Sequence, residues 1–103
     1  MMSIETESLH TAEAEQDRED RARELTADSG DDWIADNCPG SFGCHELLDR
    51  AALLAQVVES QLLSHPACVA RPEWYRLVRE AVTALNELYQ AVGAEHLSAD
   101  EVS

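Results

Sequence analysis

The sequence predicts an all-α protein built on an antiparallel hairpin of two helices, at about residues 44–64 and 72–92. Three observations carry this prediction. Neither stretch contains a Gly or an internal Pro, apolar residues recur in both at steps of three and four, and only seven residues connect them. These steps place apolar side chains on one side of a helix, and so short a connection returns the second helix alongside the first.

The first predicted helix has a broad apolar face and clear ends. Ser41 or Gly43 is suited to its start, because small and hydroxyl residues cap helix N-termini. His65-Pro66 ends it, since the residue before a proline is driven out of the helical region. We expect its buried stripe to be centred on Leu47, Ala51, Leu54, Val58 and Leu62. Neighbouring apolar residues widen this stripe, namely Leu48, Ala52, Ala55 and Leu63.

The second predicted helix begins at Pro72, which fits the first helical position, and Gly93 is suited to follow its last turn. Its main seam repeats in heptads, and a second stripe with a period of seven runs beside it. The seam comprises Trp74, Val78, Ala81, Leu85, Leu88 and Val92, and the second stripe Tyr75, Val82 and Tyr89.

Acidic arms flank this hairpin domain of residues 38–96. Residues 1–37 hold 12 acids and three arginines, and residues 97–103 form a short acidic tail. We expect the N-terminal arm to be partly disordered, as acidic tails that keep a protein soluble are, or to form a frayed helix over roughly 11–25, because good helix formers lack an apolar stripe there. Asp28 to Asp32 predicts a break, after which Trp33 and Ile34 are expected to dock on the core.

The two helices carry more apolar surface than they can cover for each other. Below roughly 70–80 residues a single core rarely supplies more than a few kcal/mol. We therefore expect a homodimer or a higher oligomer, in which two hairpins form a four-helix bundle. The predicted interface residues are Leu48, Leu63, Trp74, Val82 and Tyr89.

The composition excludes several classes of function. Seven arginines and no lysine against 21 acids, a net charge of −14, argue against direct binding of nucleic acid. The longest apolar stretches are far shorter than the roughly 18 residues of a membrane span, and no secretion signal precedes them. We expect a soluble, cytoplasmic protein that does not bind membranes.

The cysteines and histidines do not form a convincing reactive centre. Zinc would need Cys38, Cys44 and His45 to meet His65 and Cys68, but about 30 Å of helix separates these groups in one chain. A Cys38–Cys44 disulfide is sterically conceivable, yet cytoplasmic thiols are usually reduced. A Cys44 nucleophile lacks a base and an oxyanion site. We therefore expect no enzyme, no metal and no cofactor.

One basic cluster offers an alternative function. Arginine forks recognise phosphate and aromatic rings stack on bases, so a cleft between protomers would suit a nucleotide-type ligand. Charge balance on an exposed helix face is the competing explanation of the same residues. The candidate ligand-binding residues are Arg71, Tyr75, Arg76 and Arg79.

Four short segments of the chain resemble known phage and prophage proteins. They are the run from Phe42 to Arg50, the His65-Pro66 turn, the Trp74-Tyr75 pair and the run from Leu88 to Gly93. Over residues 42–96 the chain resembles small helical-hairpin proteins of phages and proteobacterial prophages. Its Phe-Gly-x-His opening is similar to that of phage proteins that sequester cyclic-nucleotide defence signals. In size, acidity and lack of catalytic residues it also resembles anti-CRISPR-type proteins.

These inferences favour a non-enzymatic interaction protein, of the kind that phages use to inhibit a host defence system. Its acidic arm would bind a basic, nucleic-acid-binding protein surface by charge complementarity. An oligomeric protein that binds or sequesters a nucleotide-type ligand is the alternative. The acids expected to contact a protein partner are Glu13, Glu15, Asp17, Glu19 and Asp20.

Overall fold

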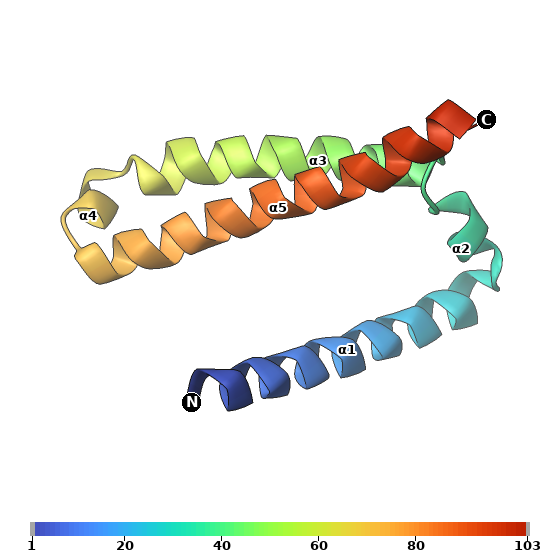
Figure 1. Cartoon of the computed structure of the whole chain (residues 1–103), viewed down its shortest axis with the longest axis horizontal. Coiled ribbons are helices and arrows are strands. Elements are labelled where there is room, and N and C mark those ends of the chain that lie inside the picture. The colour runs from blue at the N-terminus through green and yellow to red at the C-terminus, as the bar shows by residue number, and fades with distance from the viewer. Residues whose placement is uncertain (1, 103) are drawn as a thin grey trace. The chain divides into compact units, whose positions relative to one another are not determined.

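The computed structural model describes the backbone of residues 2–102 and the side chains of residues 11–99. Every regular element in this range is helical, which confirms the predicted all-α class. The elements are α1 (Met2–Ser29), α2 (Asp32–Asp36), α3 (Phe42–Val58), the π-helical turn η1 (Glu59–Leu63), α4 (Pro66–Val69) and α5 (Pro72–Val102) (Figure 1). None of the helices within the described range is long and apolar enough to cross a membrane.

The chain divides into two compact units, residues 1–35 and 36–103. In the first unit, α1 extends well beyond the predicted range of 11–25, because no Gly or Pro interrupts the sequence between Met2 and Ser29. Gly30, at φ +74°, ends it in a left-handed conformation that favours glycine.

Trp33 packs on the last turns of α1. Its indole Nε1 donates a hydrogen bond of 3.0 Å to Thr26 Oγ1, and Trp33 and Ile34 line a shallow apolar hollow together with Ala22. The first unit therefore has its own local contacts. Docking of these two residues on the hairpin core stays a prediction.

The second unit is the predicted hairpin. Helix α3 and η1 run alongside α5, and the single turn of α4 lies in the connection between them (Figure 1). Ser41 caps α3, since its Oγ accepts a hydrogen bond of 3.2 Å from the Cys44 N–H. His65 caps α4 through Nδ1, and Pro66 and Pro72 occupy the first positions of α4 and α5. The cap at Ser41, the end before Pro66 and the start at Pro72 agree with the sequence analysis, whereas the short helix α4 was not predicted.

The buried stripe of the first helix lies along one edge of the broad face that the sequence predicted. The buried residues of α3 are Cys44, Leu48, Ala51 and Ala55, and the next one, Leu63, follows eight residues later. Two turns of regular α-helix span about seven residues, so the wider π-helical turn inserts one residue. As a result Leu63 is only 9% exposed, whereas Leu62 is 51% exposed.

The second helix does not end at Gly93, as the sequence predicted, but continues to Val102. The added turns have a surface on which to pack, because the segment before α3 crosses this end of α5. The N–H of Gly40 donates a hydrogen bond of 2.9 Å to Nδ1 of the buried His96. The predicted acidic tail from residue 97 is therefore a continuation of α5 up to Val102.

The predicted seam of the second helix is also displaced. Val82 is buried against α3, while Tyr75, Val78, Leu85 and Val92 are half-buried. The predicted seam residues Trp74, Ala81 and Leu88 are exposed instead. The actual seam lies between the two predicted stripes. The side of α5 that is buried is the side that faces Leu48 and Ala55 of α3 and Leu63 of η1.

Candidate functional site: the open face of the hairpin

Large apolar side chains remain exposed along one side of the hairpin. Each of them is 40–56% exposed, although each comes from a well-formed helix with a buried face of its own. We call this surface the open face, and it comprises Leu47 and Leu54 of α3, Leu62 of η1, and Trp74, Leu77 and Leu88 of α5.

Helix geometry places these six residues on the same side. At about 100° per residue, Leu47 and Leu54 lie roughly 90–110° to one side of the line through the buried Leu48 and Ala55. Trp74, Leu77 and Leu88 lie roughly 60–140° from Val82 and Tyr89 in the same rotational sense. Because α3 and α5 are antiparallel and face each other, rotation in the same sense on both leads to the same face.

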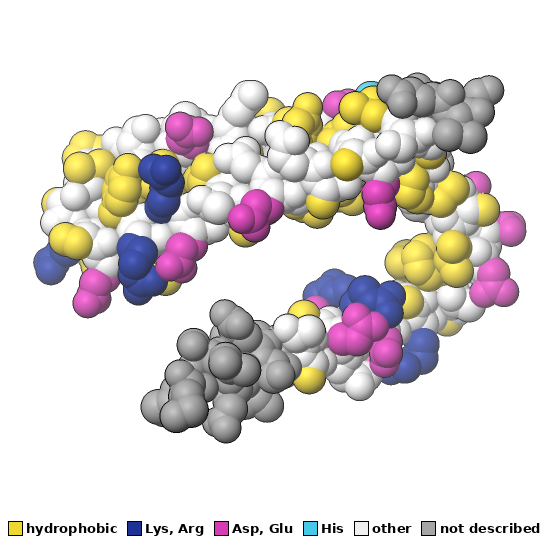
Figure 2. Space-filling model, in the orientation of Figure 1, with side chains coloured by type: hydrophobic (Ala, Val, Ile, Leu, Met, Phe, Trp, Pro, Cys, Tyr) yellow, Lys and Arg dark blue, Asp and Glu magenta, His cyan; other side chains and the backbone are white. Residues whose placement is uncertain are grey.

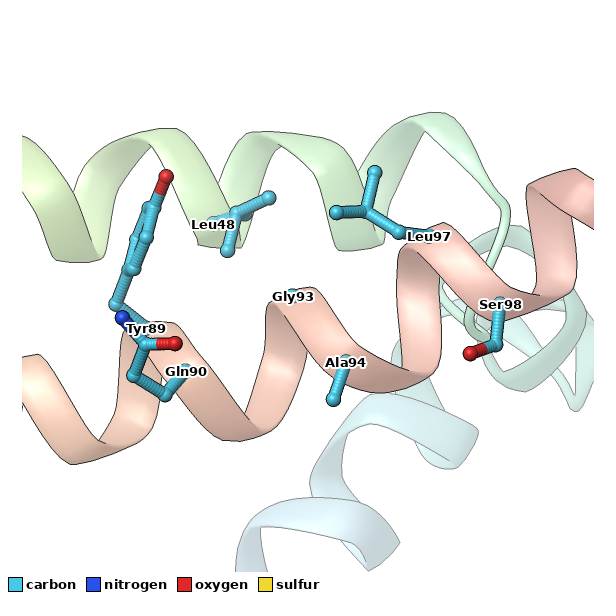
Figure 3. Close-up of a pocket in the computed structure, with 7 residues that line it drawn as sticks. All are labelled: Leu48, Tyr89, Gln90, Gly93, Ala94, Leu97 and Ser98. Carbon is cyan, nitrogen blue, oxygen red and sulfur yellow. The ribbon is translucent and has the colours of Figure 1, made fainter.

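The opposite face of the hairpin is mixed in character. A hollow of about 400 Å³ lies there between α3 and the C-terminal half of α5, where Tyr89 extends toward α3 beside Leu48 (Figure 3). A second hollow is lined by Glu59, Arg79 and Asn86. Figure 2 shows polar and charged side chains over the middle of the hairpin. The two faces thus differ in chemistry.

The open face carries almost no charge. Between Leu47 and Leu62, and between Trp74 and Ala91, the helix positions that point to this side hold Leu, Val, Ala and Trp side chains. Arg50 lies at the margin and is held at 3.3 Å from Glu46 on its own helix. A contiguous apolar surface of this kind usually marks a contact site.

Two histidines lie close together near the start of α3. His45 lies at 3.4 Å from Asp49, and its ring centroid is 5.5 Å from that of His96. Cys44 and Cys68 are buried, Cys38 is exposed, and no disulfide joins any of the three. No group of three or more His, Cys, Asp or Glu in residues 11–99 could hold a metal ion.

The predicted ligand-binding residues do not share one hollow. Arg71 stacks over the Trp74 ring at 5.3 Å and lines a shallow hollow at the start of α5. Arg76 pairs with Glu80 at 2.8 Å, and Arg79 lines a different hollow. Tyr75 is half-buried at the hairpin seam. The structure therefore distributes this cluster over separate surfaces.

Of the predicted interface residues, Leu48, Leu63 and Val82 are covered by their own chain. They are core residues of the hairpin and are not free to contact a second copy, which corrects that part of the prediction. Trp74 and Tyr89 stay exposed. The sequence analysis missed Leu77, whose spacing of three from Trp74 was the available signal.

Three of the predicted partner-binding acids contact arginines of their own helix. Glu15 pairs with Arg18, Asp17 with Arg21 at 3.3 Å, and Asp20 with Arg23. The hydrogen bond from the Arg18 guanidinium lowers the pKa of Glu15 below its ordinary value. Glu13 and Glu19 are exposed on the same helix.

Comparison with known proteins adds one similarity. No family model matches the chain, and no solved structure matches it. The chain is similar to the PEP-dependent dihydroxyacetone kinase, phosphoryl donor subunit DhaM of Escherichia coli (strain K12), with 32% identity over 107 aligned positions. The alignment covers 96% of this chain and 21% of that protein. The chain thus spans about a fifth of the length of this relative, and the similarity concerns one segment of a larger protein.

Proposed function

We propose that the chain is a non-enzymatic protein-interaction module in which the hairpin is the rigid scaffold. The observation that carries this proposal is the open face, an uncharged apolar surface built by two helices at once. A functional protein surface of this kind loses its apolar exposure when a partner covers it. The buried side chains behind it, such as Leu48 and Val82, fix the spacing of the two helices.

The arm supplies the second part of the proposed function. The N-terminal arm of residues 1–37 carries most of the excess negative charge, and acids of its helix α1 such as Glu13, Glu15 and Glu19 are exposed. A surface of this charge accelerates and orients association with a basic protein. We propose a basic, nucleic-acid-binding protein as the partner of the arm, consistent with the resemblance to phage inhibitors of host defence.

A salt series with matched charge variants tests this partner class. Basic proteins that the immobilised chain retains at low salt are purified, and their Kd values are measured at increasing salt concentration. Replacing Glu13, Glu15 and Glu19 by Gln is expected to weaken binding by about tenfold at low salt. The control replaces Glu73, Glu80 and Glu87 by Gln, which makes the same change in net charge on the hairpin. Equal effects of both variants, or binding insensitive to salt, would contradict a role of the arm.

A second candidate follows from the similarity to a phosphoryl donor subunit. In this case a histidine nitrogen would form a bond to phosphorus while the donor's bond to phosphorus breaks. His45 is the best-placed acceptor, since its side chain is 55% exposed in the first turn of α3 and lies near Asp49. Incubation with phosphoenolpyruvate as the phosphoryl donor would then add one acid-labile phosphoryl group. This label would be lost in His45→Ala and retained in His65→Ala, whereas the interaction module predicts no label.

The alternative of a nucleotide-type ligand receives no support from the geometry, because Arg71 and Arg79 line separate hollows. Isothermal titration of the full chain against a panel of nucleotides is expected to show no heat of binding. A saturable heat that Arg79→Gln removes would favour this alternative over the interaction module.

A further inference from the structure

We propose that the open face is covered by a second copy of this chain, so that two hairpins form an antiparallel four-helix bundle. The inference rests on the proposed function, because it names the occupant of the surface that makes the hairpin a binding module. Its interface differs from the one that the sequence predicted, since it uses Leu47, Leu54, Leu62, Trp74, Leu77 and Leu88.

The size of the open face fits a dimer interface. Leu47 to Leu62 and Trp74 to Leu88 each span roughly 21–23 Å at 1.5 Å per residue, and two packed helices are about 20 Å wide. The apolar centre therefore covers about 450 Å², and the full length of η1 and α3 extends the footprint to about 650 Å². Specific interfaces bury about 600–1,000 Å² of accessible surface per partner. The full footprint lies at the low end of this range, which fits a reversible dimer.

The chain's own first helix is a poor occupant. Among the described side chains of α1, from Thr11 to Ser29, Leu25 is the one large aliphatic residue. Most of the others are acids, arginines and alanines, so the part of the helix from Thr11 to Ser29 has no apolar stripe to place on the face. Burying its carboxylates against Leu54 or Leu77 would cost desolvation energy without a compensating partner.

A second copy has the chemistry that the face requires. An uncharged apolar surface is complementary to itself, whereas a surface with charges of one sign would repel its own copy. On α5 the large Leu77 and Leu88 alternate with the small, exposed Ala81 and Ala84. This alternation offers depressions into which the leucines of a facing hairpin fit. A twofold axis through the middle of the face would pair such ridges and depressions on both copies.

Neighbouring leucines of α3 provide a matched pair of variants for the test. Leu54 is 50% exposed on the open face, and Leu53 is 58% exposed on the far side of the same helix. Sedimentation equilibrium of the full-length chain is compared with that of Leu54→Glu and Leu53→Glu. We expect a reversible dimer whose Kd rises at least about a hundredfold in Leu54→Glu, because each dimer then buries two carboxylates, and changes less than about threefold in Leu53→Glu.

A second readout protects the test against a folding defect. In a Trp33→Phe background the remaining indole is Trp74, which is 54% exposed in the single chain. Its emission is expected to move to shorter wavelength as the chain concentration passes through the Kd. If Leu54→Glu loses its helical circular dichroism, Leu77→Gln serves as the milder variant with the same expected dissociation.

The outcomes separate the inference from the proposed function. A chain that stays monomeric at high concentration, or a dimer that Leu53→Glu weakens as much as Leu54→Glu, overturns the dimer on this face. If such a monomer still binds a protein partner and Leu54→Glu abolishes that binding, the proposed function stands and only the occupant is wrong. If the dimer forms as described and binds no other protein, the inference stands and the proposed partner is wrong.

Discussion

Gly93 provides the sharpest test of the hairpin's geometry, because sequence and structure predict opposite effects of the same substitution. The sequence pattern places Gly93 just beyond the end of the second helix, where glycine adopts a positive φ. The structure places it inside α5, where it is buried and faces Leu48. Gly93→Ala therefore reports directly on whether α5 continues beyond this residue.

The expected magnitude follows from the space around Gly93. A Cβ built on this residue meets Leu48 Cδ1 at 3.6 Å, an ordinary van der Waals contact. Alanine in a helix interior is more favourable than glycine by about 0.8–1 kcal/mol. We therefore expect Gly93→Ala to stabilise the chain by about 1 kcal/mol. For a domain of this size that corresponds to a rise in Tm of about 4–8 °C.

Gly43 is the matched control, because it is also helical and undergoes the same chemical change. A Cβ at this position would overlap Asn37 Oδ1 and approach the Asp36 carbonyl oxygen to 2.9 Å. The backbone there cannot move without breaking the start of α3, so Gly43→Ala is expected to destabilise the chain by about 1–3 kcal/mol. The assay is thermal unfolding followed by circular dichroism at one fixed chain concentration.

A decrease in Tm for Gly93→Ala would contradict a helix α5 that continues through this residue. A residue held at positive φ at a helix end pays about 1–2 kcal/mol for an added Cβ. Such a result would mean that the helix ends at Gly93 and that the contact of His96 with Gly40 does not form. Whether or not α5 continues beyond Gly93, Gly43→Ala is expected to lower the Tm more than Gly93→Ala does.

Three further predictions concern single contacts. The first is measured by denaturant titration in the Leu54→Glu background, in which no second copy covers the open face. Leu63→Ala should lower the free energy of unfolding by about 2–4 kcal/mol and Leu62→Ala by less than about 1 kcal/mol. Similar losses in the two variants would contradict the π-helical turn. His96→Phe retains a ring but removes the acceptor of the Gly40 N–H, so it should cost about 1–3 kcal/mol, and a neutral effect would argue against that hydrogen bond. Because Arg18 lowers the pKa of Glu15, the stabilising contribution of this pair is present above the ordinary pKa of a glutamate and is lost as the pH falls through the lowered value. Arg18→Gln should raise the pKa of Glu15 toward its ordinary value in a carboxyl NMR titration, while Arg21→Gln should leave it unchanged.

The features that sequence could predict depend on local chemistry. The hairpin, the cap at Ser41, the end of the first helix before Pro66 and the start at Pro72 follow from residues that act within one helical turn. Periodicity also showed correctly that two helices of this composition leave apolar surface uncovered. Leu54 and Trp74 are exposed for this reason, although the pattern predicted that both were buried in the seam.

The missed features depend on contacts between distant segments. The insertion of one residue at η1 changes the phase of α3, so Leu63 and not Leu62 reaches the core. Continuation of α5 beyond Gly93 depends on Gly40, 56 residues away from its hydrogen-bond partner His96. No periodic pattern in a single helix reports such a partner. The choice of residues on the open face follows from both effects.

The most direct test of a dimer through the open face observes the leucine side chains themselves. Leucine methyl signals of the full chain are recorded by NMR with a soluble paramagnetic agent, at concentrations below and above the dimer Kd. If a second copy covers the open face, the methyl signals of Leu54 and Leu62 broaden in the dilute sample and are protected in the concentrated one, while those of Leu53 broaden in both. Persistent broadening of the Leu54 signals at high concentration, or protection of Leu53 together with Leu54, would contradict a dimer through the open face.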